Sequence, residues 1–149
     1  MTTQLDDQTL LERHYDQILN IMKNEPYGRF LGIKLTQLGP GTATAELTPD
    51  ENMVNNHGTV HGGVIFSLAD YVFAAASNSY GKTAVGVTTN VNFMSAGKLG
   101  ETLTATAEEI KKNHRLGWYY IRVYSNKELI ATMEAMVYRK NQSFIKTED

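Results

Sequence analysis

Apolar and polar positions follow two different periods along the chain. In the first part, apolar side chains recur at helical spacing and charged residues fall between them. The apolar positions are Leu11, Tyr15, Ile18 and Met22. This pattern predicts an N-terminal helix over residues 1–25, ended by the Asn, Pro and Gly of residues 24–28.

Segments that alternate between apolar and polar residues lie on both sides of one long apolar segment. Before it we expect two strands, over residues 30–38 and 42–48, joined by a Gly-Pro-Gly turn. After it we expect four strands, over residues 85–94, 103–111, 118–124 and 129–138, with turns at residues 97–100 and 113–117 and a hairpin at Asn126-Lys127. The tail over residues 140–149 is polar and is expected to fray.

The apolar segment itself predicts a helix over residues 62–78, in which Asp70 is the single charged side chain. A helix that is apolar nearly all round must be buried. An antiparallel sheet with one apolar face can cover such a helix if the sheet curls around it. The chain is therefore expected to be an α+β protein with the hotdog architecture, a curved antiparallel sheet wrapped around a long central helix. We expect one such domain over residues 1–149.

Composition and charge exclude several classes of function. The chain has 149 residues, no cysteine and a net charge of −2. It therefore has no thiolate nucleophile and no Cys-type zinc site, and it lacks the basic face that a duplex DNA-binding protein needs. No apolar run approaches the ~20 residues that span a bilayer. Because the first residues are acidic, where a signal peptide would be basic, we expect a cytoplasmic protein with no membrane partner.

The carboxylate of Asp70 is the first candidate for chemistry, because burying a charged group without partners is costly. A structural interpretation is that Asp70 bonds a loop and fixes the helix in place. The functional interpretation is that it is one reactive group in the wall of a narrow tunnel. Positions three, four and seven residues away share its helical face and are mostly small or apolar: Gly63, Phe66, Ser67, Phe73 and Ala74.

Two glycines, Gly62 and Gly63, follow His61 where this helix begins. The first N–H groups of a helix have no intrahelical partner, and this end of the helix dipole is positive. Glycine leaves those groups open to a ligand atom, so they can hold a carbonyl oxygen as it becomes an oxyanion. Alternatively, the glycines only permit a sharp turn, and both interpretations can hold together.

Gly62 and Asp70 are eight residues apart, which is ~12 Å along a helix. An acyl carbon held at Gly62 is therefore out of reach of Asp70 in the same chain. If both groups act on one bond, the carboxylate comes from a second subunit. We therefore expect at least a homodimer with two equivalent sites.

The segment from Asn55 to Gly81, NNHGTVHGGVIFSLADYVFAAASNSYG, resembles the hotdog-fold acyl-CoA thioesterases of the phenylacetic acid degradation (PaaI-like) group. The shared pattern is an Asn, then HGxxHGG, then LAD. The later segment TTNVNFMSAGKLGETLTATAEEI is similar to the strands that follow in that group. The resemblance implies hydrolysis of an acyl-CoA substrate to CoA and a free acid, without a cofactor, by a homotetramer built of two dimers.

The same resemblance implies roles for individual residues. The backbone amide of Gly62 polarises the thioester carbonyl, and Asp70 acts as general base or as nucleophile. Asn55 helps to fix the substrate carbonyl or the water, and His61 shapes the loop before the helix. A hydroxyl on the following strand positions water in related proteins, for which the candidates here are Thr88 and Thr89.

Substrate contacts are expected at two places. The acyl pocket is predicted to be formed by Phe66, Tyr71 and Phe73, which suits an aryl-acetyl or a medium-chain acyl group. The phosphates of CoA need basic side chains, and the richest basic cluster is Lys111, Lys112, His114 and Arg115, with Lys98 and Arg139 as further candidates. The alternative for this cluster is an ordinary solvated hairpin.

Three alternatives to a thioesterase fit the sequence less well. His57 and His61 have the spacing of the two histidines of HExxH, but the Glu is missing and Gly58 intervenes, so no metal is expected. A hotdog hydratase or dehydratase would need an Asp and a His close together. A non-catalytic acyl-CoA-binding sensor would normally carry a DNA-binding domain, for which the ~25 residues before the first strand are too few.

Overall fold

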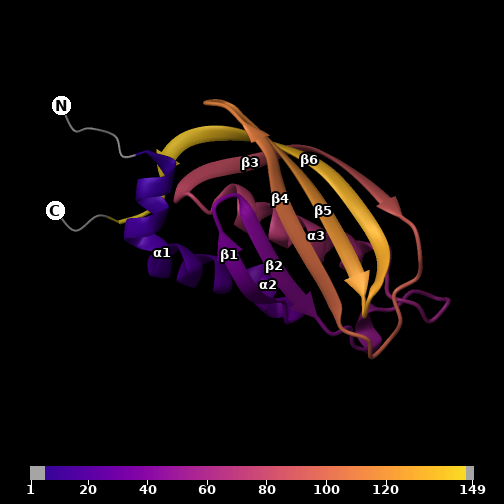
Figure 1. Cartoon of the computed structure of the whole chain (residues 1–149). Helices are drawn as coiled ribbons and strands as arrows, with labels where there is room; N and C mark the ends of the chain where they lie inside the picture. Colours follow the sequence, from indigo (N-terminus) through magenta and orange to yellow (C-terminus); the bar gives the residue numbers. More distant parts are fainter. Residues whose placement is uncertain (1–5, 147–149) are drawn as a thin grey trace.

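The computed structural model describes residues 6–146, which form three α-helices, a short 3₁₀ helix and one antiparallel sheet (Figure 1). The sheet has six strands in the order β1-β2-β4-β5-β6-β3. The strands are β1 (Lys34–Gly39), β2 (Thr42–Leu47), β3 (Lys82–Phe93), β4 (Leu103–Lys112), β5 (Leu116–Ser125) and β6 (Glu128–Ser143). The helices are α1 (Asp7–Lys23), α2 (Pro26–Leu31), η1 (Glu51–Met53) and α3 (Gly62–Ser77).

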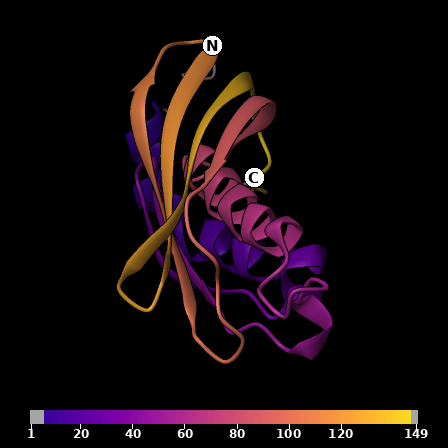
Figure 2. The ribbon, with the colours of Figure 1, turned by 90° about the vertical axis from the view of Figure 1, so that its right-hand side faces the viewer.

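The long apolar helix α3 lies along the concave face of the curved sheet (Figure 2) and contacts all six strands. Its buried positions, including Leu68 and Val72, meet the inward side chains of the strands, such as Ile121 and Met133. Strand residues alternate between this core and the outer face, as the pleat requires. The expected α+β architecture, a curved antiparallel sheet around a central helix, is confirmed.

The strand order could not be derived from the sequence. β3 follows α3 directly but pairs with the last strand, β6, and so becomes one edge of the sheet. The other edge is β1. An edge strand has one row of unpaired backbone groups, which matters for assembly.

The predicted strand over residues 30–38 is wrong in its first part, because Phe30 and Leu31 belong to helix α2. Glu25 caps this helix, Pro26 occupies its first turn, and Gly32 ends it with a φ of 80°. Proline at the start and a left-handed glycine after the end are typical helix boundaries. The strand β1 begins only at Lys34.

The expectation of a frayed tail from residue 140 is also wrong for its first part. β6 continues to Ser143, which pairs with Lys82 at the start of β3. Ile145 is then buried against the core, with 7% of its surface exposed. The turn expected over residues 113–117 is shorter, since Gly117 lies inside β5. The described part of the chain contains no helix that is long and apolar enough to cross a membrane.

Candidate active site

The loop before α3 is organised by Asn55 and Thr59. The Oδ1 atom of Asn55 accepts hydrogen bonds from the amides of His57 (2.9 Å) and Thr59 (3.2 Å), and its Nδ2 donates to the Thr59 hydroxyl (3.0 Å). The backbone amide of Asn55 donates to the Thr59 carbonyl at 2.8 Å. The Asn55 side chain therefore holds the loop in shape from within.

His61 caps the helix that this loop enters. Its Nδ1 accepts a hydrogen bond from the Gly63 amide at 2.8 Å, and its own amide donates to the Met53 carbonyl at 2.8 Å. Helix α3 therefore begins where the sequence predicts, with its second amide already bonded. His57, by contrast, is exposed. In residues 6–146 no three His, Asp or Glu side chains gather in a way that could hold a metal.

The Gly62 amide is the first donor of α3, and among the described residues it has no hydrogen-bond partner. A Cβ atom at this position would lie 3.5 Å from the Phe93 ring, an ordinary contact distance. The amide thus lies at the positive end of a 16-residue helix, beside the last residue of β3. This is the geometry expected of a donor to a developing oxyanion.

One stripe of α3 is open to solvent in the isolated chain. Gly63, Asp70 and Ala74 are exposed, and Ser67 is partly exposed. Ser67 Oγ donates to the Gly63 carbonyl at 2.8 Å, as a helical serine commonly does. Phe66 is partly buried against the core.

The prediction that Phe73 shares the open face of Asp70 is wrong. Only 2% of Phe73 is exposed, and its ring packs edge-on against Tyr119 of β5 at a centroid distance of 5.7 Å. Residues three and four positions from Asp70 lie on either side of it around the helix axis, and the sheet covers one of these two sides. Phe73 falls on the covered side and Ala74 on the open side.

Asp70 lies in a pocket of about 140 Å³ between α3 and the segment that joins α1 to β1. The pocket is lined by Met22, Glu25, Tyr27, Gly28, Ile33, Ser67, Asp70, Tyr71, Ala74 and Ala75. Although Asp70 is exposed on the open stripe, the pocket walls partly desolvate its carboxylate, which raises its pKa above the usual value, and the negative charge of Glu25 raises it further. A carboxylate with a raised pKa is a stronger base, as proton transfer from water requires.

Half of this pocket was missed by the sequence analysis, which assigned no chemistry to the first helix and the residues after it. Glu25 and Tyr27 come from that region, and the Tyr27 hydroxyl lies 3.1 Å from Ser67 Oγ. Helix start and stop signals around Pro26 and Gly32 could have revealed α2. No local pattern could have placed α2 against Asp70.

Thr88 and Thr89 lie on opposite faces of β3. Thr89 pairs with Ala135 of β6, and Ala135 pairs in turn with Tyr119 of β5, whose side chain points into the core. Thr88 pairs with Met136 of β6, whose side chain points to the outer face. Successive residues of a strand always point to opposite faces. Only Thr89 therefore lies on the side of the sheet that carries α3.

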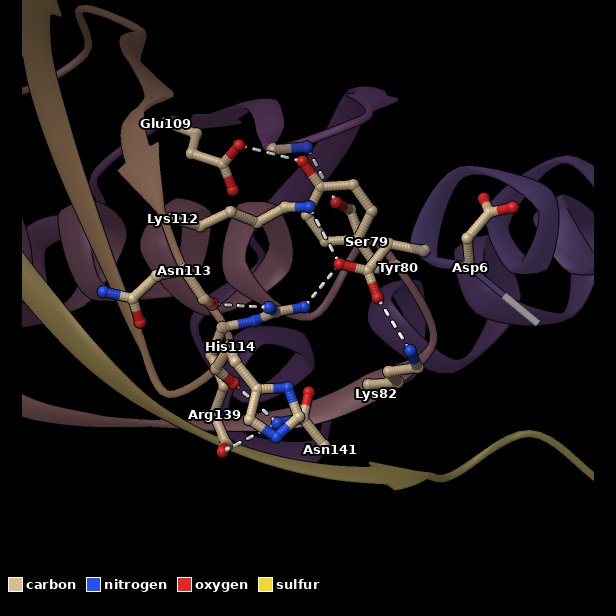
Figure 3. A network of polar contacts seen from close by, with 12 residues as sticks. Asp6, Ser79, Tyr80, Lys82, Glu109, Lys112, Asn113, His114, Arg139 and Asn141 are labelled. Carbon is tan, nitrogen blue, oxygen red and sulfur yellow. Dashed lines mark hydrogen bonds and ion pairs between the residues drawn. The ribbon is translucent and has the colours of Figure 1, made fainter. Parts of the chain in front are cut away.

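The basic cluster predicted to hold CoA phosphates is divided by the fold. The side chains of Lys82, Lys112 and Arg139 point toward one another (Figure 3). All three bind the carboxylate of Asp7 in α1, with both lysine Nζ atoms at 2.8 Å. Their side chains are 9–26% exposed, so these cations are part of the structure. Arg139 also donates to the Asn113 carbonyl at 2.8 Å. The expectation that Lys112 and Arg139 are free for phosphate is therefore wrong.

Two other members of the predicted basic cluster, Lys111 and Arg115, point elsewhere. Lys111 pairs with Trp118 on the outer face of the sheet, where it and Thr88 line a groove of about 740 Å³ with Tyr120. Arg115 Nη1 donates to the Tyr138 hydroxyl at 2.8 Å in the turn between β4 and β5. None of these residues lines the pocket that contains Asp70.

Comparison with known proteins agrees with this geometry. The model of the thioesterase superfamily matches residues 57–141. The acyl-coenzyme A thioesterase PaaI of Escherichia coli is 36% identical over 106 residues, covering 71% of this chain and 76% of that protein. The solved structure of E. coli PaaI, from the phenylacetic acid degradation operon, has a TM-score of 0.84 at 30% identity and covers 90% of this chain and 98% of its own. Human acyl-coenzyme A thioesterase 13 is 33% identical over 99 residues, covering 64% of this chain and 71% of that protein. The chain therefore belongs to the thioesterase superfamily, as a PaaI-like member with the hotdog fold.

Proposed function

We propose that this protein is an acyl-CoA thioesterase in which the Gly62 amide binds the thioester carbonyl and Asp70 activates water. The observation that carries the proposal is the unpartnered Gly62 amide at the start of α3, on the same helix as the exposed Asp70. Two relatives, E. coli PaaI and human acyl-coenzyme A thioesterase 13, are named acyl-coenzyme A thioesterases. Both the motif and the open donor therefore support the same reaction.

The reaction follows from these two groups. Asp70 accepts a proton from water as the water oxygen bonds to the thioester carbon. The carbonyl oxygen becomes negative and is stabilised by the Gly62 N–H. When the tetrahedral intermediate collapses, the C–S bond breaks and the CoA thiolate leaves. The proton held by Asp70 returns to that sulfur, so the products are a carboxylic acid and CoA.

The active unit is proposed to be a homodimer at least, and a homotetramer by the family resemblance. Gly62 and Asp70 lie on one regular helix, ~12 Å apart along its axis. Because this distance is too long for both groups of one chain to act on the same thioester, the Asp70 of one subunit would act together with the Gly62 of another. β3 is an edge strand with exposed Val85 and Val87, and its end, Phe93, lies beside Gly62. A copy docked at this edge would lie next to the Gly62 amide.

The substrate's acyl group is proposed to be aryl-acetyl or medium-chain. The pocket beside Asp70 has apolar walls from Met22, Ile33 and the Tyr71 ring, in which an acyl chain could lie. Lys111 and Arg115 remain the proposed contacts for the CoA phosphates, on surfaces away from that pocket. If they act in this way, raising the ionic strength raises KM, because the attraction is screened.

The proposed roles of Asn55 and His61 are indirect. The Oδ1 atom of Asn55 accepts hydrogen bonds from the loop amides, and the Nδ1 atom of His61 accepts one from the Gly63 amide. Both residues therefore act by positioning the Gly62 amide. Thr89 is the better of the two threonine candidates for holding water, because Thr88 lies on the outer face.

A thiol-release assay over a panel of acyl-CoAs tests the function. The panel contains phenylacetyl, hydroxylated aryl-acetyl and C4 to C12 acyl thioesters. We expect turnover of at least one class by the parent protein and a loss of about 10²- to 10⁴-fold with Asp70→Asn. Hydration of an enoyl-CoA without thiol release would instead identify a hydratase. Tight binding of acyl-CoA without turnover would identify a sensor.

A further inference from the structure

The pocket beside Asp70 contains a second carboxylate, that of Glu25. The two residues are 45 positions apart in the chain and line the same space of about 140 Å³. Glu25 lies between α1 and α2, outside every motif that the sequence suggests. The thioester hydrolysis described above makes no use of it.

Three contacts hold Glu25 in place relative to α3. Its Oε2 accepts a hydrogen bond from the Gly28 amide at 3.2 Å. The Tyr27 hydroxyl lies 3.1 Å from Ser67 Oγ, and the Tyr71 hydroxyl donates to the Met22 carbonyl at 2.9 Å. The chain on both sides of Glu25 is thus bonded to the helix that carries Asp70.

Close packing fixes the same junction. A Cβ atom at Gly28 would lie 2.7 Å from the Tyr71 ring and 2.8 Å from Glu25 Oε2. Such distances are too short for any side chain, so only glycine permits α2 to approach α3 this closely. Glu25 therefore has a defined position in the pocket.

The titratable groups that line the pocket with Asp70 come from three elements. The junction before α2 contributes Glu25, α2 contributes Tyr27, and α3 itself contributes Tyr71. Burial and the charge of Glu25 raise the pKa of Tyr71 to about 12, so this phenol is neutral at working pH. The residues that line the pocket include no Lys, Arg or His. Nothing in the pocket wall therefore neutralises the two carboxylates.

We propose that Glu25 is a positioning residue, which keeps the carboxylate of Asp70 basic enough to take a proton from water. This inference rests on the proposed thioesterase function. A negative charge on Glu25 in the same partly enclosed space disfavours the charged form of Asp70, so Asp70 holds a proton more tightly than it would alone. Asp70 then accepts the proton of the attacking water more readily, while Glu25 itself touches no reacting atom.

The test combines a direct titration with kinetics. Carbon-13 NMR of labelled aspartate follows the Asp70 carboxyl from pH 3 to 8 in the parent protein and in Glu25→Gln, with Asp70→Asn identifying the signal. Glu25→Asp keeps the charge and serves as the rescue. Glu12→Gln removes an equal charge from an exposed position on α1 and serves as the matched control. The pH profiles of kcat and KM are recorded for the parent protein, Glu25→Gln, Glu25→Asp and Glu12→Gln.

We expect the Asp70 titration midpoint to fall by about 0.5 to 1 pH unit in Glu25→Gln and to stay in place in the control. The acid limb of kcat should move by a similar amount, and kcat at its plateau should fall roughly two- to fivefold with KM unchanged. An unmoved midpoint, or a moved midpoint with an unmoved acid limb, overturns the inference. Absence of thiol release from the parent protein would overturn the proposed function instead, and the titration would still decide the coupling.

Discussion

The Gly63 amide donates to His61 Nδ1 at 2.8 Å, one residue after the unpartnered Gly62 amide. The cap therefore takes the second donor of α3 and leaves the first donor open. A helix terminus with all its amides capped could not hold an oxyanion, and an uncapped one would fray. Of these two adjacent amides, that of Gly63 therefore stabilises the helix start and that of Gly62 can bind a substrate oxygen.

Replacing His61 with alanine should destabilise the protein by about 0.5 to 2 kcal/mol, the usual cost of losing a helix cap. Thiol release should also fall, since the loop no longer fixes Gly62. Urea denaturation gives the stability and the acyl-CoA assay gives the rate. The control is His57→Ala, because this exposed residue contributes only its backbone amide to the loop bonds. Equal stability losses in the two variants would refute the capping role.

Gly62→Pro removes one N–H group and little else. Proline suits the first position of a helix, and the preceding His61 has a ψ of 135°, which a residue before proline prefers. We expect kcat to fall about 10²- to 10³-fold with the fold retained. Gly62→Ala keeps the amide, and its Cβ would lie 3.5 Å from the Phe93 ring, so it should keep most of the activity. Full activity of the proline variant, measured by thiol release, would rule out the Gly62 amide as the oxyanion donor.

Mixed dimers test whether a site is shared between subunits. A chain with Asp70→Asn and a chain with Gly62→Pro are each expected to have little activity alone. In their heterodimer, one site combines an intact Gly62 with an intact Asp70, and the other site has both defects. The purified heterodimer should therefore show about half of the parent rate. Two differently tagged chains allow its isolation, and a heterodimer with no recovered activity would contradict the shared site.

Asp7 should be a large contributor to stability. Its carboxylate binds Lys82, Lys112 and Arg139, and these hydrogen bonds and charges hold its pKa well below the ordinary value although burial opposes them. Asp7→Asn leaves three cations together and should cost about 2 to 4 kcal/mol.

The pH dependence of this effect has a defined sign. Because the folded-state pKa of Asp7 is lowered, its stabilisation is complete above the unfolded-state pKa of about 4 and is lost as pH falls toward the folded-state pKa. The difference in the free energy of unfolding between the parent protein and Asp7→Asn should therefore be largest at neutral pH and should decrease below about pH 4. Glu108→Gln is the control, since its bond to Arg122 is an exposed ion pair worth at most about 1 kcal/mol. A gap that is independent of pH would show that the charge of Asp7 is not responsible.

The charge of Asp70 should have the opposite effect on stability from that of Asp7. Its raised pKa means that the charged form is less favourable in the folded chain than in the unfolded chain. Asp70→Asn should therefore have a melting temperature equal to or above that of the parent protein at neutral pH, even though its activity is lost. This advantage should disappear as pH falls through the Asp70 pKa, which melting curves between pH 3 and 8 would show. A clear loss of stability at pH 7 would mean that Asp70 has a structural role.

Much of the site follows from sequence spacing alone, because it lies on one helix. The backbone geometry of a helix places Gly62 and Asp70 ~12 Å apart and brings Gly63, Ser67 and Ala74 to the stripe of Asp70, whatever surrounds them. The helix boundaries at His61 and Ser77 agree with those predicted to within a residue. Local hydrogen bonding decides these features, so the sequence could predict them.

Only the tertiary structure decided which neighbours these residues have. It buried Phe73 against Tyr119, bound Lys112 and Arg139 to Asp7, and brought Glu25 into the pocket of Asp70. The members of each pair are separated by between 45 and 132 positions, and they come from elements that no period in the sequence relates to each other. Spacing along a chain defines directions within one element, whereas burial and charge depend on which elements the folded sheet and helices bring together.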